Sequence, residues 1–131
     1  MIRRAVEADI PRIVGMVERL AKAVDGPQRV CRVRAGETLC GLLTSPDGAA
    51  WVSEGGFIAG TIMQTIISPD PVAIELGWFA EDRSGLALLR EFERWAESKG
   101  AVLIKLSCNG GVAQRMLERA GYRVAEIAMV K

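Results

Sequence analysis

A strand, a short loop and a helix follow one another between Glu75 and Leu89 in a pattern that suits anion binding. The loop contains Arg83, Ser84 and Gly85, and the helix begins directly after it. The first backbone N–H groups of a helix have no partners in the chain, and with the helix dipole they attract phosphate groups. Gly85 has no Cβ to obstruct a phosphate, and Arg83 can add a charge-assisted hydrogen bond. The alternative is an ordinary turn with a solvated arginine.

Acid–base chemistry in this chain cannot involve histidine, because the sequence contains none. Catalytic triads and general bases built on imidazole are therefore excluded. Proton transfer must fall to Glu, Asp, Lys, Tyr, Cys or water. The cysteines Cys31, Cys40 and Cys108 are widely spaced and odd in number, so they predict neither a zinc site nor a disulfide framework. We expect each of them to be a small buried residue.

Hydrophobic periodicity predicts the elements that position these residues. Strands are expected at residues 2–6, 49–53, 57–67, 72–79, 102–106 and 122–130. Helices are expected at residues 10–24, 35–43, 84–99 and 111–120. The helix at 84–99 has the clearest pattern, with a buried side formed by Leu88, Leu89, Phe92, Trp95 and Ala96.

The order β-α-α-β-β-β-α-β-α-β predicts an α/β (α+β) fold in which a mixed, mostly antiparallel sheet is flanked by helices. The strand–helix–strand unit at residues 72–106 requires its two strands to run parallel or nearly so. No repeat or linker divides the chain, so we expect one domain at 1–131. Alternation along the strand 72–79 puts Glu75 on one face with Gly77 and Phe79. A glycine within a strand, such as Gly77, often marks a bulge or a close approach of a ligand.

The bulk composition is that of a globular domain. The 131 residues are 50% hydrophobic and 25% charged, and the net charge is +1, which argues against nucleic acid as the main partner. No stretch is apolar enough to cross a membrane, and the N-terminus lacks the apolar core of a signal peptide, so we expect the cytoplasm. Arg29, Arg32 and Arg34 alternate with valines. They either line the entrance for an acidic substrate or form a solvated face.

Four blocks of sequence follow one another in a familiar spacing: the opening at 2–10, the loop and helix start at 75–89, the helix end and strand at 95–106, and the stretch 117–122. Together they resemble the GNAT superfamily of N-acetyltransferases, in the compact form found in phages and prophages. In that family an R/Q-x-x-G-x-G/A loop opens the coenzyme-binding helix. A later aromatic signature matches Gly121-Tyr122, in which Tyr122 is the structural aromatic residue.

The resemblance implies transfer of an acetyl group from acetyl-CoA to a primary amine of an unidentified acceptor, with no metal. It places Glu75 where a carboxylate helps remove the proton of the amine. It also implies that the central strands separate, so that backbone groups of Trp78 and Ala80 bond to the pantetheine arm. The implied partners are a small-molecule or protein amine and a second copy of the chain, with no nucleic acid or membrane. The predicted cofactor-binding residues are Trp78, Phe79, Ala80, Arg83, Ser84, Gly85, Leu86, Ala87, Leu88 and Asn109.

The chain departs from the family pattern at three positions. Asp82 stands where the loop usually has Arg or Gln, and Asn109 lies one residue away from the family's asparagine. Leu117 occupies the position of a tyrosine that commonly protonates the leaving thiolate. These departures favour the alternative of a non-catalytic module that binds CoA or a partner. A further alternative is an unrelated α/β nucleotide or metabolite binder.

Overall fold

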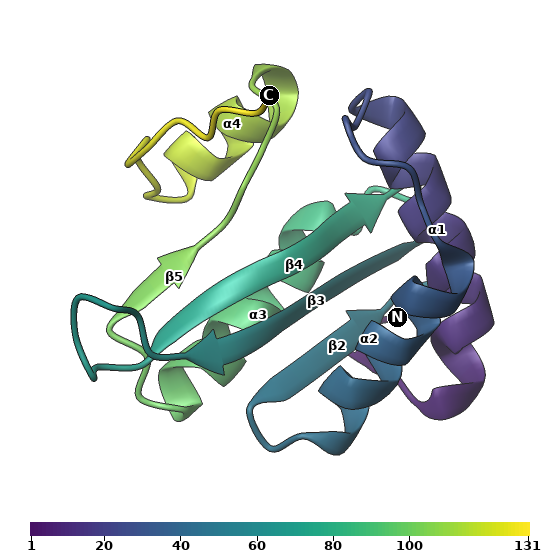
Figure 1. The fold of residues 1–131 in the computed structure, drawn as a ribbon, viewed down its shortest axis with the longest axis horizontal. Coiled ribbons are helices and arrows are strands. Elements are labelled where there is room, and N and C mark those ends of the chain that lie inside the picture. Colours follow the sequence, from purple (N-terminus) through teal and green to yellow (C-terminus); the bar gives the residue numbers. More distant parts are fainter.

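The computed structural model describes residues 1–131 and contains one five-stranded mixed sheet (Figure 1). The strands are β1 (Arg3–Arg4), β2 (Gly48–Val52), β3 (Gly56–Met63), β4 (Val72–Ala80) and β5 (Leu103–Lys105). The helices are α1 (Ile10–Ala23), α2 (Arg32–Thr44), α3 (Gly85–Ser98) and α4 (Gly111–Arg119), with a 3-10 turn at Glu7–Asp9. The strands lie in the order β1-β2-β3-β4-β5. The first four are antiparallel, and β5 pairs with β4 in parallel, which confirms the predicted strand–helix–strand unit.

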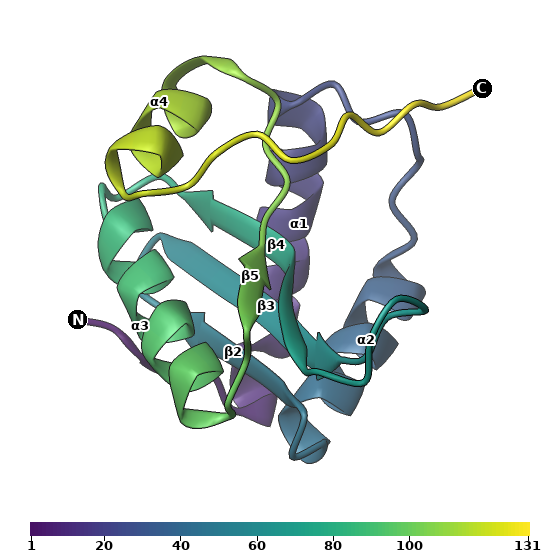
Figure 2. The same cartoon turned by 90° about the vertical axis from the view of Figure 1, so that its left-hand side faces the viewer.

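Helices cover the two faces of the sheet, with α3 on one face and α1 on the other (Figure 2). Beneath α1 and α2, a core cluster joins these helices to Val52, Phe57 and Ala59. A second cluster lies beneath α3 and includes Trp51 and Ile58. The apolar stripe predicted for α3 is buried in this second cluster throughout, and Leu117 of α4 joins it. No helix of the fold is long and apolar enough to cross a membrane.

Gly60 lets α3 approach β3 closely. A Cβ at this position would lie 2.3 Å from Cε1 of Phe92 and 2.6 Å from the carbonyl oxygen of Ile74. Such distances are not compatible with a packed core, so the ring of Phe92 occupies the space that a side chain at residue 60 would need. Gly60 therefore sets the distance between α3 and the sheet.

The predicted last strand, at residues 122–130, is wrong, because the chain after α4 forms no strand. The amide of Tyr122 donates to the carbonyl of Leu117, and its hydroxyl donates to Oε2 of Glu93 at 2.9 Å. Residues 123–131 then make no backbone–backbone hydrogen bond. Figure 2 shows this segment running from α4 past β5 to the C-terminus. An apolar stretch is thus present without the neighbouring strand that a β-ladder requires.

The cysteines also differ from the expectation, because Cys31, Cys40 and Cys108 are all exposed and free. Cys31 lies at the start of α2, where its sulfur accepts a hydrogen bond from the amide of Arg34 at 3.5 Å. The residue type alone gave no information about these positions.

Candidate functional site

A β-bulge interrupts β4 at Leu76. Ala59 of β3 pairs with Gly77, but the next residue, Gly60, pairs with Glu75, so Leu76 has no partner. Gly77 had indicated either a bulge or a close approach of a ligand, and the register shows a bulge. A Cβ on Gly77 would lie 2.9 Å from Cε2 of Phe57, which explains the glycine. The extra residue reverses the alternation of the strand after Glu75.

The bulge makes the predicted face of Glu75 wrong. Ala73 belongs to the core cluster beneath α3, and Glu75, two residues later and still before the bulge, lies on the same face. Phe79 instead packs against the cluster beneath α1 and α2, and Gly77 faces Phe57 of that cluster. Glu75 therefore does not share a face with Gly77 and Phe79.

Glu75 lies at the point where β4 and β5 separate. The last paired residues are Ile74 and Lys105, and beyond them the chain leaves β5 and diverges from β4 toward α4 (Figure 1). Oε1 of Glu75 accepts a hydrogen bond from the amide of Ser107 at 3.1 Å, across the start of this gap. Burial raises the pKa of Glu75 to about 7, and the hydrogen bond from Ser107 opposes part of that rise. A carboxyl group with this pKa can exchange protons near neutral pH.

Beyond Glu75, the edge of β4 that faces away from β3 has no neighbouring strand. The amide of Glu81 donates to the carbonyl of Gly55, next to β3. Backbone groups alternate between the two edges of a strand, so those of Trp78 and Ala80 point to the open edge. Free N–H and C=O groups on such an edge can bind an extended chain that carries its own amides.

The start of α3 offers three backbone amides without partners. The amide of Leu88 donates to the carbonyl of Ser84 at 2.9 Å, and the amide of Ser84 donates to Oδ1 of Asp82 at 3.2 Å. The amides of Gly85, Leu86 and Ala87 donate to no atom of the chain. Three adjacent free amides at the start of a 14-residue helix can bind an anion.

Two charged side chains flank these amides. Arg83 has a φ of 65°, a left-handed conformation that is uncommon for arginine, and it forms no ion pair. Asp82 accepts hydrogen bonds from the Ser84 hydroxyl and from the amide of Gly55, and these bonds hold the pKa of Asp82 well below its usual range. Asp82 therefore stays ionised and is occupied with holding the loop.

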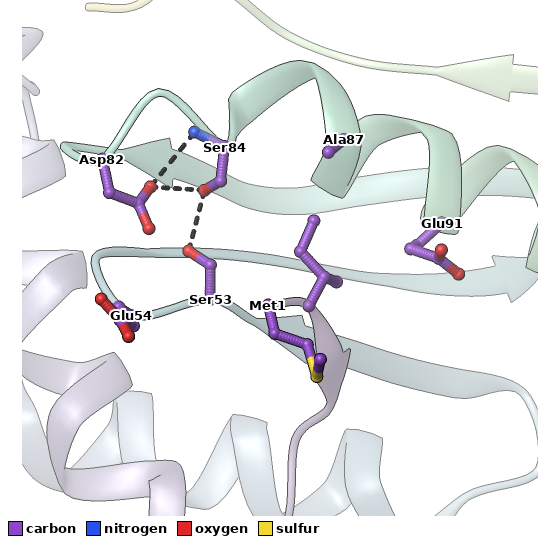
Figure 3. A pocket seen from close by; sticks show the side chains of 8 residues that line it. Met1, Ser53, Glu54, Asp82, Ser84, Ala87 and Glu91 are labelled. Atoms are coloured by element: carbon purple, nitrogen blue, oxygen red, sulfur yellow. Dashed lines mark hydrogen bonds between the residues drawn. The ribbon is translucent and has the colours of Figure 1, made fainter.

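A pocket of about 620 Å³ lies beneath the start of α3, and Figure 3 shows its lining. Its wall includes the carboxylates of Glu54, Asp82 and Glu91, and also the predicted cofactor-binding residues Ser84 and Ala87. Three carboxylates repel phosphate groups, so this pocket does not suit the pyrophosphate of a coenzyme. No such group of carboxylates lines the other side of the helix start, next to the open edge of β4, so a pyrophosphate would bind there more favourably.

The side chains of three other predicted cofactor-binding residues, Trp78, Leu88 and Asn109, make contacts within the fold. Nε1 of Trp78 donates to the carbonyl of Gly85 at 3.0 Å, and a Cβ on Gly85 would lie 3.8 Å from both that nitrogen and Cβ of Ala80. The Leu88 side chain is fully buried. Nδ2 of Asn109 donates to the carbonyl of Val24 at 3.2 Å, which links the loop after β5 to the end of α1.

The position of the family's tyrosine offers no proton donor. Leu117 is buried in the core beneath α3, and the hydroxyl of Tyr122 is engaged with Glu93. Burial and the nearby Glu93 carboxylate raise the pKa of Tyr122 above its ordinary value.

Sequence reasoning missed a second, apolar pocket of about 400 Å³ between α1, α2 and the sheet. The bulge residues Leu76 and Gly77 form part of its wall, together with Arg29, which precedes α2, and Arg34, in the first turn of α2. The alternation of arginine and valine at residues 29–34 was the only signal of it in the sequence.

Comparisons with known proteins place this fold. No protein-family model matches the chain, and no curated protein sequence does either. Among solved structures, a transcriptional regulator from Bacillus halodurans C-125 is similar over 100% of this chain and 97% of its own, with 20% identity and a TM-score of 0.79. An acetyltransferase of Trypanosoma brucei is similar over 100% and 97%, with 14% identity and a TM-score of 0.75. AAC(6')-Iy, in complex with the bisubstrate analogue CoA-S-monomethyl-acetylneamine, is similar over 100% and 95%, with 17% identity and a TM-score of 0.74.

The chain therefore has the fold of the GNAT acetyltransferases, as the resemblance of its sequence implied. At these identities the likeness establishes the fold alone. The chemistry of this chain must be argued from its own site.

Proposed function

We propose that the protein transfers an acetyl group from acetyl-CoA to a primary amine. The observation that carries this proposal is the unpaired edge of β4, which leads from Glu75 toward the three free amides at the start of α3. An extended arm with amide groups suits the open edge, and a pyrophosphate suits the helix start. The solved complex of AAC(6')-Iy with a CoA analogue supports CoA as the kind of cofactor that this fold accepts.

The residues that would hold acetyl-CoA follow from this arrangement. The backbone groups of Trp78 and Ala80 would bond to the pantetheine arm. The free amides of α3 would bind the pyrophosphate, and Arg83, an exposed cation without an ion pair, would add a charge-assisted hydrogen bond to a phosphate. We do not assign Leu88 or Asn109 to the cofactor, because the amide of Leu88 and the side-chain amide of Asn109 already have partners.

Acetyl-CoA supplies a thioester whose carbonyl carbon becomes bonded to the amine nitrogen as the thiol departs. The amine must be neutral to attack, so Glu75 is proposed to take its proton, directly or through water. The pKa of about 7 suits this role, because the carboxylate is available at neutral pH and still basic enough to accept a proton. With Leu117 at the tyrosine position, the thiolate takes its proton from water. A free thiol has a pKa of about 8.5, so the thiolate is a fair leaving group.

The second candidate function is a module that binds CoA or a partner without turnover. Leu117 and the engaged amide of Asn109 favour it, because neither can assist catalysis. Both candidates predict binding of CoA. They differ in whether free thiol appears when acetyl-CoA and an amine are present together.

The test measures CoA binding and thiol release in parallel. CoA at a hundred times its dissociation constant should stabilise the fold by about 2.7 kcal/mol, seen as a higher melting temperature. Acetyl-CoA with a panel of primary amines should release thiol, at a rate that rises with pH as Glu75 ionises through about pH 7. Stabilisation by CoA without thiol release from any amine would leave the binding module as the function. No stabilisation at millimolar CoA would contradict both candidates.

The role of Glu75 is tested with Glu75→Gln, which keeps the size of the side chain and removes the base. A positioned base typically contributes about 10²–10⁴-fold, so the variant should lose most of its turnover at pH 7. It should recover part of that turnover at higher pH, where free amine is abundant, and its affinity for CoA should be unchanged. The matched control is Glu97→Gln, an exposed glutamate of α3. Wild-type turnover of Glu75→Gln at pH 7 would remove Glu75 from the mechanism.

We also propose a homodimer in the cytoplasm. Val102, Leu103, Val124, Ile127 and Met129 are exposed at β5 and in the C-terminal segment, which leaves apolar surface for a second copy to cover. Three exposed cysteines would form mixed disulfides in an oxidising compartment, so a reducing one suits this chain. Light scattering should give twice the protomer mass of 14.2 kDa at micromolar concentration, whereas a mass of one protomer would contradict the dimer.

A further inference from the structure

The loop that precedes α3 is joined to the turn between β2 and β3 through Asp82. Oδ2 of Asp82 accepts a hydrogen bond from the amide of Gly55 at 2.9 Å. Its Oδ1 accepts a hydrogen bond from the hydroxyl of Ser84 and another, at 3.2 Å, from the amide of Ser84 (Figure 3). Both oxygens of one carboxylate therefore hold together two segments that lie 27 residues apart in the chain.

The turn between β2 and β3 is itself fixed by its neighbours. The hydroxyl oxygen of the buried Ser53 lies 2.8 Å from that of Ser84. Nη1 of Arg12 in α1 donates to the carbonyls of Ser53 and Glu54 at 2.8 and 2.9 Å. A Cβ on Gly56 would lie 2.9 Å from the hydroxyl oxygen of Ser84, so a glycine permits the close approach. Asp82 thus joins the loop to a turn that α1 holds in place.

The backbone between this carboxylate and the free amides of α3 is constrained. Arg83, directly after Asp82, has the left-handed φ of 65°, and Ser84 is the N-cap residue of α3. A left-handed residue other than glycine costs energy and persists only where the surrounding structure holds it. The hydrogen bonds of Asp82 and Ser84 act on both sides of Arg83 and provide this hold. From the other side, Nε1 of Trp78 donates to the carbonyl of Gly85 at 3.0 Å.

The two acceptor oxygens of Asp82 cannot be replaced by Arg or Gln, the residues that usually stand at this position of the loop. An arginine has no acceptor, and a glutamine or asparagine has only one acceptor oxygen. Neither can receive the donors of Gly55 and Ser84 at both positions. On charge alone, however, a carboxylate near the start of α3 should weaken the binding of a phosphate.

We propose that Asp82 is a positioning residue of the cofactor site, which fixes the loop and the first turn of α3 before the cofactor binds. This inference rests on the proposed binding of acetyl-CoA. The free amides of Gly85, Leu86 and Ala87 are then in place for the pyrophosphate, and no loop has to be ordered during binding. A site that is ordered in advance binds more tightly. This gain exceeds the repulsion between the carboxylate and the phosphates.

The test compares CoA with pantetheine, which has the same extended arm and lacks the pyrophosphate, by NMR titration. Asp82→Asn and Asp82→Gln should bind CoA about tenfold or more weakly than wild type, because each loses hydrogen bonds to a charged group. Their affinity for pantetheine should equal that of wild type, because this ligand does not reach the start of α3. Unchanged or tighter binding of CoA would overturn the inference. Equal weakening of CoA and pantetheine would also overturn it, because it would indicate general damage to the fold.

Glu54→Gln is the matched control for charge. Glu54 lines the same acidic pocket as Asp82 and forms no ion pair. Both residues are exposed, so the fold should tolerate each change. Glu54→Gln should bind CoA at least as tightly as wild type. A tenfold loss of CoA affinity in this control would contradict a specific role for Asp82.

Ser84→Ala tests the same contact from its other end. This variant loses the hydroxyl that connects Asp82 to Ser53 and keeps the backbone amide. It should bind CoA about threefold or more weakly, with unchanged affinity for pantetheine. In the double variant with Asp82→Asn, the loss should be smaller than the product of the two single losses, because both changes break one contact. Single losses that simply multiply would contradict the proposed link between the two residues.

The wild-type titration separates this inference from the proposed function. If the wild-type protein binds no CoA at millimolar concentration, the proposed function is contradicted, and the role of Asp82 with it. If wild type and the Asp82 variants bind CoA equally well, only the role of Asp82 is overturned.

Discussion

The two ends of the sheet differ in how well they are covered. All five residues of β2 are buried, whereas no residue of β5 is. After Ala96, Leu117 is the only buried residue of the chain. The region from β1 to α3 is thus a complete core with helices on both faces, and the region from β5 to the C-terminus is a thin extension of it.

This difference determines where a ligand can bind. In the packed region β2 and β3 each pair with a strand on both sides, so most of their backbone groups are used by the fold. At the boundary, β5 pairs with only three residues of β4 and the rest of that edge stays open. One side of the site is therefore formed by the well-packed elements β4 and α3. The other side is formed by β5 and α4, which bury few residues.

The largest effect should come from filling space in the packed region. Gly60→Ala places a Cβ 2.3 Å from Cε1 of Phe92, which forces α3 away from the sheet. We expect a loss of about 3 kcal/mol or more in the free energy of unfolding, measured with urea. The control is Gly41→Ala in α2, where a Cβ would meet nothing within 4 Å. It should be neutral or stabilise the protein by up to about 1 kcal/mol, and a similar loss in both variants would contradict the packing argument.

Asp9 should be the most important charge of the packed region. Its carboxylate accepts hydrogen bonds from Nη1 and Nη2 of Arg3 at 2.7 and 2.8 Å and from the amide of Val6 at 2.8 Å. The hydrogen bonds from Arg3 and Val6 lower the pKa of Asp9 to about 2. Asp9→Asn should cost about 1–3 kcal/mol at pH 7.

The pH dependence follows from the sign of the Asp9 shift. The native state holds the proton less tightly than the unfolded state, so the stabilisation is complete above the ordinary pKa near 4 and is lost as the pH falls toward 2. The difference between wild type and Asp9→Asn should therefore shrink over that range. Asp70→Asn, at an exposed carboxylate without an ion pair, should have no measurable effect.

At the boundary, Glu75 should act on stability in the opposite direction. Its pKa is raised to about 7, so the native state binds the proton more tightly, and wild-type stability falls as the pH rises from about 4.5 to 7. The glutamine side chain of the Glu75→Gln variant does not ionise, so this variant should not lose stability over that pH range. It should be more stable than wild type at pH 8, by an amount on the order of 1–3 kcal/mol, and close to wild type at pH 4. Equal stability at both pH values would show that Glu75 is not buried as described.

The smallest effect should come from the thin region. Removal of residues 123–131 deletes no buried side chain and no backbone–backbone hydrogen bond, and breaks one exposed ion pair, between Lys105 and Glu126. The protomer should lose less than about 1 kcal/mol in the free energy of unfolding, measured under monomeric conditions. A loss as large as that of Gly60→Ala would show that the C-terminal segment belongs to the core.

The contrast between the two regions also explains what the sequence could predict. The stripe on α3 was identified correctly because its five apolar residues face a sheet that covers all of them. The same kind of reasoning failed for residues 122–130, because an apolar pattern gives no information on whether a neighbouring strand exists to pair with it. Leu103 illustrates the point, since it lies in an apolar run but is 56% exposed.

The candidate site shows a second limit. Gly77 indicated the bulge, but the residue at which the register shifts depends on how β3 and β4 pair, and a shift of one residue reverses the faces. Glu75 was therefore identified as a candidate base and placed on the wrong face. Arg29 and Arg34 could not be separated from Arg32 in the sequence, because the ion pair with Glu18 forms only when α1 and α2 pack together.

The most direct test of the account is to map CoA onto the backbone by following amide chemical shifts during a titration. We predict that the largest changes occur at Trp78 and Ala80 on the open edge of β4 and at Gly85, Leu86 and Ala87 at the start of α3. Amides of the apolar pocket between α1, α2 and the sheet, such as that of Leu39, should change little. Changes confined to the acidic pocket around Glu54 and Glu91, or no changes at millimolar CoA, would contradict the proposed cofactor site.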